Sequence, residues 1–401
     1  MKTLLLGILV VLLLVHNPCD YATMQNNAVN AKNELASSGL QETQVVNQPS
    51  QPAKTKKPRE KKKKSTHRGT IVAAPLPIVS PAIGSGIVPI LGYIFPFNKN
   101  DKISPPSTVG AAGLITNNGS SGFGLGGQLF MKENRYEISS LYVHGNIDYN
   151  LYGIGIPAGN GNLKIPLDQT GHLYFAEALR RIPWQFFIGP RFWTGDSVVT
   201  VRPTNGETSI PPADLGLHTT LRALGFRVVR DTRPDHYYPT TGIFTQFTSD
   251  FFAKALGGKY TFQSYRFTFN KYGTVAKNQV LAYNFYLCGT GGDPPFYGNC
   301  IYGTNNELRG YEAGRYLDRY MIATQLEYRV SLPKGFGLAA FGGLGEVVPG
   351  GKEIFRINNF LPSIGGGPRF ELSKKYHVNL RADFAKGKDS WTWSMGVGEA
   401  F

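Results

Sequence analysis

The stretch IATQLEYRVSL, residues 322–332, alternates between two kinds of side chain. Every second residue from Ile322 to Leu332 is apolar or aromatic except Thr324, and the residues between them are small, polar or charged. Residues 262–270 and 378–385 show the same alternation. A period of two is typical of a β-strand whose two faces meet different surroundings. In the wall of a membrane β-barrel, one face meets lipid and the other meets the lumen.

A soluble β-sandwich would also alternate, with its apolar face toward a core. Three features favour a membrane barrel instead: an apolar segment at the N-terminus, a high aromatic content, and a last strand that carries Trp391 and Trp393 and runs to Phe401. Residues 93–401 hold 49 of the 50 aromatic side chains, which indicates one large folded body after a long leader.

The first 22 residues are typical of a secretory signal peptide. Lys2 precedes an apolar run over residues 4–15, and Pro18 then breaks it. A run of this length is too short for a membrane-spanning helix, which needs roughly 20 residues. A lipid anchor on Cys19 is the alternative, although Pro18 and Asn17 stand where such a motif has small or apolar residues. No later segment is apolar enough to form a spanning helix, so we expect any membrane span to consist of strands.

Residues 23–80 are polar and are predicted to form a disordered tail on the periplasmic side. The run 54–68 holds nine Lys and Arg against one Glu, within a formal net charge of +15 for the chain. In an exported protein such a run meets lipid headgroups, lipopolysaccharide phosphates or an acidic partner before any nucleic acid; a solubilising linker is the alternative. Residues 81–401 are predicted to form an all-β transmembrane barrel of 16 strands, with 14 as the alternative.

Cys288 and Cys300 remain as a pair once the leader is removed. In an exported chain this pairing predicts a disulfide across a short Gly- and Pro-rich loop, which stabilises the fold by about 3 kcal/mol. No metal site or cofactor is expected, because no cluster of soft ligands accompanies these cysteines and the seven histidines show no ligand spacing.

Several motifs between residues 224 and 401 occur in the order of a known family. They are Asp231-Thr232-Arg233 with Pro239 and Gly242, the run LRGYEAGRY at 308–316, EYR at 327–329, FGGLG at 341–345, and NLRAD at 379–383. Together they resemble the BamA/TamA superfamily of outer-membrane assembly and translocation proteins, also called the bacterial surface antigen family.

The resemblance implies that the loop with Arg309, Gly310 and Tyr311 folds back into the lumen, where the guanidinium meets acidic side chains of the wall. Glu327 is the best partner by position, and Asp383 serves if the fold brings it close. The family often has an Asp where Gly343 stands here. Phe401 resembles the C-terminal sorting signal that outer-membrane barrels present to their assembly machinery, although Glu399 departs from its usual apolar residue.

The resemblance also implies a function in inserting, assembling or translocating proteins at the Gram-negative outer membrane. Its expected partners are lipids and lipopolysaccharide, the barrel-assembly machinery for the chain's own insertion, and client outer-membrane proteins. Residues 23–80 are too short and too polar for the periplasmic POTRA domains of such proteins, so we expect a short form without them. The alternative is a passive pore or structural barrel. Enzymatic activity is not expected, since no Gly-x-Ser-x-Gly nucleophile motif is present.

Overall fold

The computed structural model describes residues 69–80, 83–98, 100–101, 103–161, 164–202, 218–302, 308–373, 377–388 and 390–401. The predicted signal peptide, the basic run 54–68 and most of the predicted tail lie outside these described residues. No helix of the described residues is long and apolar enough to cross a membrane.

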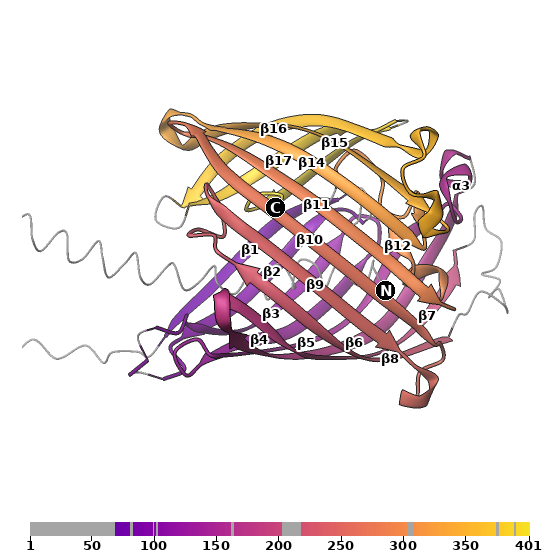
Figure 1. The fold of residues 1–401 in the computed structure, drawn as a ribbon, viewed down its shortest axis with the longest axis horizontal. Helices are drawn as coiled ribbons and strands as arrows, with labels where there is room; N and C mark the ends of the chain where they lie inside the picture. The colour runs from indigo at the N-terminus through magenta and orange to yellow at the C-terminus, as the bar shows by residue number, and fades with distance from the viewer. Residues whose placement is uncertain are drawn as a thin grey trace, which may run out of the picture.

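Sixteen strands of the described chain close into one antiparallel barrel (Figure 1), which confirms the predicted all-β fold and the preferred strand number. Neighbouring strands follow in chain order, except that β12 and β13 form a separate small sheet. The barrel strands are β1 (Thr70–Ser80), β2 (Gly84–Phe95), β3 (Ser107–Thr116), β4 (Ser121–Met131), β5 (Tyr136–Leu151), β6 (Ile165–Ile182), β7 (Phe186–Val201), β8 (His218–Asp231), β9 (Gly242–Phe252), β10 (Phe262–Ala276), β11 (Gln279–Gly292), β14 (Tyr320–Ser331), β15 (Phe336–Val348), β16 (Leu361–Ser373), β17 (Val378–Lys386) and β18 (Trp391–Val397).

The barrel begins earlier than the sequence predicted. β1 starts at Thr70, inside the range assigned to the disordered tail, so the boundary at residue 81 was wrong. This strand has no aromatic residue and contains Pro75 and Pro77, two features that disfavour a strand in sequence-based reasoning. β1 is nevertheless held in the sheet, because it pairs with β2 along its whole length, from Thr70 opposite Ile94 to Ser80 opposite Gly84.

The alternation seen in the sequence separates the two faces of the wall. In β14, Leu326 and Tyr328 are exposed on the outside, whereas Glu327 and Arg329 are buried on the inside. Many large apolar side chains are exposed over the outer surface, as a lipid-facing barrel requires. They include Ile87, Leu91, Val109, Phe123, Leu125, Ile138, Leu224, Phe226, Phe251, Leu281, Leu338, Leu344, Ile364, Phe384, Trp391 and Trp393.

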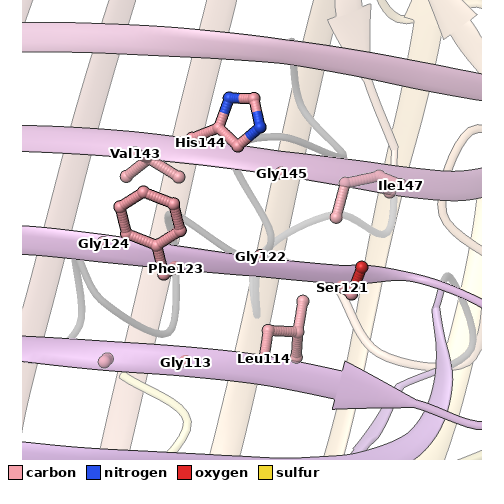
Figure 2. A pocket seen from close by; sticks show the side chains of 11 residues that line it. Gly113, Leu114, Ser121, Gly122, Phe123, Gly124, Val143, His144, Gly145 and Ile147 are labelled. Atoms are coloured by element: carbon pink, nitrogen blue, oxygen red, sulfur yellow. The ribbon is translucent and has the colours of Figure 1, made fainter.

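The inner face is not polar throughout. On β5, β6 and β7 the buried face carries Leu141, Val143, Leu173, Phe175 and Trp193, which belong to one apolar cluster. This side of the lumen therefore offers an apolar surface against which a loop can pack. Across the nearby strands β3, β4 and β5, glycines leave a depression of about 10 Å³ in the wall, beside which Phe123 and His144 stand out from the sheet (Figure 2).

The two ends of the barrel differ in their connections. At one end, here called the turn end, most strands are joined by two to four residues, although residues 96–106 and 232–241 make longer connections. At the other, the loop end, residues 152–164, 253–261, 293–319 and 349–360 make long connections, whereas residues 81–83, 117–120 and 387–390 make short ones. Outer-membrane barrels have short turns on the periplasmic side and longer loops outside. The connection 293–319, between β11 and β14, is called the inward loop below.

Candidate functional site: the inward loop and the strand seam

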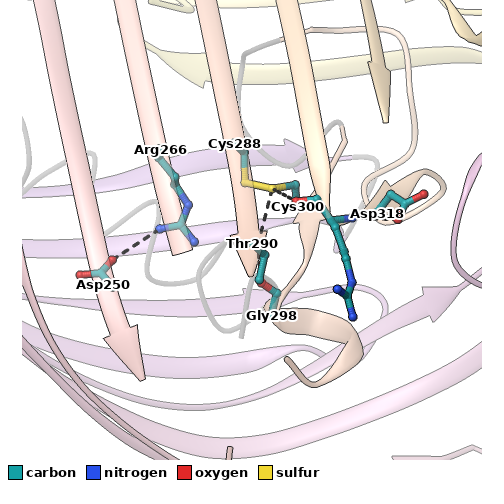
Figure 3. The surroundings of a disulfide bond; sticks show 8 residues. Asp250, Arg266, Cys288, Thr290, Gly298, Cys300 and Asp318 are labelled. Carbon is teal, nitrogen blue, oxygen red and sulfur yellow. Dashed lines mark hydrogen bonds and ion pairs between the residues drawn. A yellow bond between two sulfur atoms is a disulfide. The ribbon is translucent and has the colours of Figure 1, made fainter. Parts of the chain in front are cut away.

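The inward loop is fastened to the wall at its base. Cys288, at the end of β11, forms a disulfide with Cys300 of the short strand β12 (Cys300–Ile301), as the sequence predicted (Figure 3). β12 pairs with β13 (Leu317–Asp318), so both limbs of the loop are held together. The loop then reaches across the barrel, where Arg315 Nε donates to Gly159 O at 3.0 Å in the helix α3 (Ile156–Asn160).

Arg309, near the middle of the inward loop, lies against the inner wall with all three of its guanidinium nitrogens engaged. Its Nε donates to Gln325 Oε1 at 3.1 Å, its Nη1 donates to Asp383 Oδ2 at 2.9 Å, and its Nη2 contacts Glu327. The guanidinium carbon also lies 3.4 Å from the ring centre of Phe341. The fold thus brings both carboxylates named from the sequence to one arginine, and it adds an amide and a cation–π contact.

Gly310 and Tyr311 fix the turn of the loop after Arg309. Gly310 has φ +111°, and a Cβ there would lie 3.0 Å from Gly387 N, so a side chain meets both strain and a close backbone. The ring of Tyr311 packs edge-on between those of Tyr302 and Tyr316, and its hydroxyl accepts from Lys388 N at 3.1 Å. The Arg-Gly-Tyr triplet therefore holds the loop against β14, β17 and the connection that follows β17.

Gly343 has a structural reason to lack a side chain. A Cβ on this residue of β15 would lie 2.4 Å from Leu308 Cδ1 and 2.4 Å from Thr324 O. Leu308, which precedes the arginine in the loop, occupies the space that the family's Asp side chain would take. The acidic contact missing from this position is supplied from β17 by Asp383.

Three further arginines and one further carboxylate join this cluster, and the sequence analysis named none of them as site residues. Arg329 donates to Glu327 at 2.5 Å, Arg369 and Arg381 each donate to Asp383 at 2.8 Å, and Arg369 Nε donates to Glu399 Oε2 at 2.8 Å. All these side chains are at least nine-tenths buried. Arg369 and Arg381 lie directly opposite each other on β16 and β17, a like-charge pair that needs acceptors nearby. Sequence spacing alone does not reveal this register.

The chain end belongs to the same cluster. The sequence predicted a closing strand that runs to Phe401, but β18 ends at Val397 and Gly398 turns the backbone at φ +82°. Glu399 then enters the lumen instead of the membrane, where it also accepts from Asn379 Nδ2 at 2.8 Å. Phe401 O accepts from Arg329 Nη2 at 3.0 Å. The charged residue that departs from the usual sorting pattern is thus explained by an inward turn.

The seam between the first and last strands is the weakest pairing described in the barrel. β1 pairs with β18 at one position, Val79 opposite Met395, among the described residues. In that register, Pro77 faces Val397 and the earlier part of β1 faces residues 398–401, which turn inward. The edge of β1 from Thr70 to Leu76 therefore has no described partner on the seam side.

The prolines of β1 also lie where they weaken the seam. Pro75 is paired with Pro89 of β2, and since neither has an N–H, this is a non-hydrogen-bonded pair. The backbone nitrogens of Pro75 and Pro77 consequently point away from β2, toward β18. Two donors are missing from the seam edge, a device that limits edge-to-edge pairing in natural sheets.

A second charged cluster lies on the opposite inner wall. Glu177 accepts from Arg227 Nη1 at 2.9 Å and lies 3.3 Å from Arg191 Nε, while Asp250 accepts from Trp193 Nε1 at 2.9 Å. These residues come from β6, β7, β8 and β9, and they were not named from the sequence. Among the described residues, no group of three or more His, Cys, Asp or Glu could hold a metal ion.

A comparison with known protein families agrees with these features, namely the closed barrel, the inward loop with Arg-Gly-Tyr, and the arginine that contacts carboxylates of the wall. The Omp85 superfamily domain matches residues 117–398, most of the chain. The chain belongs to the Omp85 superfamily.

Solved structures of similar fold agree with this assignment. BamA from Haemophilus ducreyi lacking POTRA domains 1–3 matches this Omp85 chain with a TM-score of 0.52 at 13% identity, over 82% of this chain and 70% of that one. CdiB from Acinetobacter baumannii matches with a TM-score of 0.53 at 12% identity, over 82% and 60% of the two chains. CdiB from Escherichia coli matches with a TM-score of 0.54 at 9% identity, over 84% and 68%. At such identities the likeness concerns the fold. No curated protein sequence gives a significant match. An Omp85 barrel fold places the chain in a Gram-negative outer membrane.

Proposed function

We propose that this Omp85 barrel inserts or translocates polypeptide at the outer membrane by exposing the unpaired edge of β1 to an incoming strand. The observation that carries the proposal is the seam, with one described pair between β1 and β18 against a full ladder between β1 and β2. An extended segment binds such an edge through main-chain hydrogen bonds. The missing donors at Pro75 and Pro77 keep the edge from closing firmly while its carbonyls remain available.

The inward loop supports the proposal as a latch. Arg309 joins β14 and β17 through Glu327 and Asp383, and Tyr311 reaches the connection between β17 and β18. Glu399 connects the same cluster to the chain end beside the seam. We infer that this network keeps the last strands in place while the neighbouring edge opens. In this arrangement the turn end and the chain before β1 face the periplasm, and partners are lipids, lipopolysaccharide, the assembly machinery and client proteins.

Reconstitution into liposomes tests the proposal against a passive pore. Purified protein should accelerate the folding of an urea-unfolded outer-membrane barrel client into the same liposomes, measured by protease protection and by the shift of the folded client on gels. A parallel assay follows the leakage of a small entrapped dye. Faster client folding supports the proposal, whereas leakage without faster folding would establish the pore instead.

A further inference from the structure

Exposed arginines surround one exposed tryptophan at the turn end of β5 to β8. Trp184 lies in the connection between β6 and β7, and it is 83% exposed. Arg180 and Arg181 precede this connection at the end of β6, and Arg230 lies at the end of β8. Arg230 Nε donates to Trp184 O at 3.0 Å, and Arg181 N donates to Arg135 O at 2.8 Å. These five residues, here called the basic corner, therefore lie together on the rim of the barrel.

The basic corner borders the lipid-facing surface of the barrel. Arg180 is paired with Ile188 of β7, and directly paired residues of neighbouring strands share one face of a sheet. Ile188 is 39% exposed, so the side chain of Arg180 lies on the outer wall. Arg230 follows the exposed Phe226 by four residues in β8, which places it on the same outer face. Both arginines thus lie where the apolar outer wall ends.

The arginines of the basic corner are available to an anion. None of them forms an ion pair with a carboxylate of the described residues, whereas the buried arginines of both lumenal clusters do. Asp231, the residue after Arg230, is paired with Arg233 instead. Glu133, in the neighbouring connection, is exposed and is accompanied by Lys132. The basic corner therefore presents positive charge that these carboxylates do not balance.

We propose that the basic corner binds the phosphate headgroup of an anionic phospholipid. A guanidinium fork donates two parallel hydrogen bonds to a phosphate, and several arginines on one surface favour a lipid with a net negative charge. The indole of tryptophan prefers the interface between acyl chains and water, next to the phosphates. The guanidinium of Arg230 lies 5.7 Å from the ring centre of Phe186, which holds it against the outer wall. The acyl chains then lie along Ile188 and Phe226.

A lipid fits the basic corner better than a soluble anion, because the charge and the apolar surface are continuous there. The loop end of the neighbouring strands differs: Arg202 is paired with Asp148 at 3.0 Å, and Arg222 with Asp196 at 3.2 Å. In the orientation proposed above, the turn end faces the periplasm, so the bound lipid belongs to the inner leaflet. This choice of leaflet rests on the proposed function, whereas the binding itself does not.

Quenching of tryptophan by brominated phospholipid tests the site in the full chain, reconstituted into phosphatidylcholine liposomes. Trp391 and Trp393 are first replaced by phenylalanine, which leaves Trp184 and Trp193, and Trp193 is only 4% exposed on the inner wall. A small fraction of brominated phosphatidylglycerol should quench Trp184 more strongly than the same fraction of brominated phosphatidylcholine. The difference should shrink at high salt, because salt screens exposed charges. Equal quenching by the two lipids at low salt overturns the proposal.

Variants locate the lipid preference. Arg180→Gln with Arg230→Gln should weaken the preference for phosphatidylglycerol about tenfold, since each cation near a membrane surface contributes to binding, whereas Arg180→Lys with Arg230→Lys should keep most of it. Lys254→Gln with Lys352→Gln removes the same charge from exposed positions at the loop end and is the matched control. A preference that survives in the first variant, or is lost equally in the control, overturns the proposal. Client folding is measured separately in the same liposomes, so failure of the lipid site and failure of the proposed function are distinguished.

Discussion

Arg309 owes its position to groups from four strands, β14, β15, β16 and β17. Gln325 and Glu327 on β14, Phe341 on β15 and Asp383 on β17 surround the guanidinium, and Ser363 contacts its backbone carbonyl. Buried pairs of this kind contribute little net stability compared with apolar residues, but removing one partner leaves the others unpaired. Arg309 therefore connects several of the last strands, and its removal is expected to destabilise their packing.

Arg309→Ala should lower the unfolding free energy by about 3 kcal/mol, because Glu327 and Asp383 each lose a buried partner. Urea unfolding in detergent, followed by tryptophan fluorescence, measures the effect. The matched control is Arg356→Ala, whose pair with Glu353 is 63% and 36% exposed and should contribute about 0–1 kcal/mol. Equal effects of the two substitutions would contradict the buried network.

At the scale of elements, β1 combines a complete ladder on one side with an almost empty edge on the other. Sequence reasoning missed this strand because its prolines and lack of aromatics resemble a linker. The same prolines explain the open edge once the register with β2 is known, since that register decides which way each missing N–H points. The sequence contained the residues but not their pairing.

Pro77→Val should close the seam further, because a valine N–H can bond to Val397 of β18 in the observed register. We expect slower hydrogen exchange in β18 and slower client insertion. Pro89→Val is the control, since the nitrogen of Pro89 faces β3 rather than the seam. Faster insertion by Pro77→Val, or the same change in both variants, would count against the role assigned to this edge.

The disulfide holds the base of the inward loop rather than the latch itself. Replacing Cys288 and Cys300 by serine should reduce stability by about 3 kcal/mol in the chain-entropy account. It should also speed tryptic cleavage at Arg315 and Arg319 in the loop. Arg309 keeps its wall contacts, so we expect the client-folding rate to change less than in Arg309→Ala. A larger loss of activity than in Arg309→Ala would assign the latch to the disulfide.

At the scale of the whole molecule, alternation, export signals and the Arg-Gly-Tyr companions predicted the closed barrel, its sixteen strands and the loop that carries Arg309. Sequence spacing does not fix strand register, which brings distant residues together. For this reason four members of the cluster were not predicted as site residues, namely Arg329, Arg369, Arg381 and Glu399. The apolar inner face of β5–β7 was also unexpected, since the alternating stretches 262–270, 322–332 and 378–385 place mainly polar side chains on the inner face. The barrel thus has a charged wall near its seam and a mixed wall opposite.

A reversible cross-link across the seam shows whether client folding requires β1 and β18 to separate. Val79→Cys with Met395→Cys joins the one described pair of β1 and β18, and Val330→Cys with Leu338→Cys joins paired residues of β14 and β15 as the control. Oxidation of the seam pair should stop client folding in liposomes, a reductant should restore it, and the control pair should have no such effect. Client folding at an unchanged rate with a cross-linked seam would show that the seam does not open to the client.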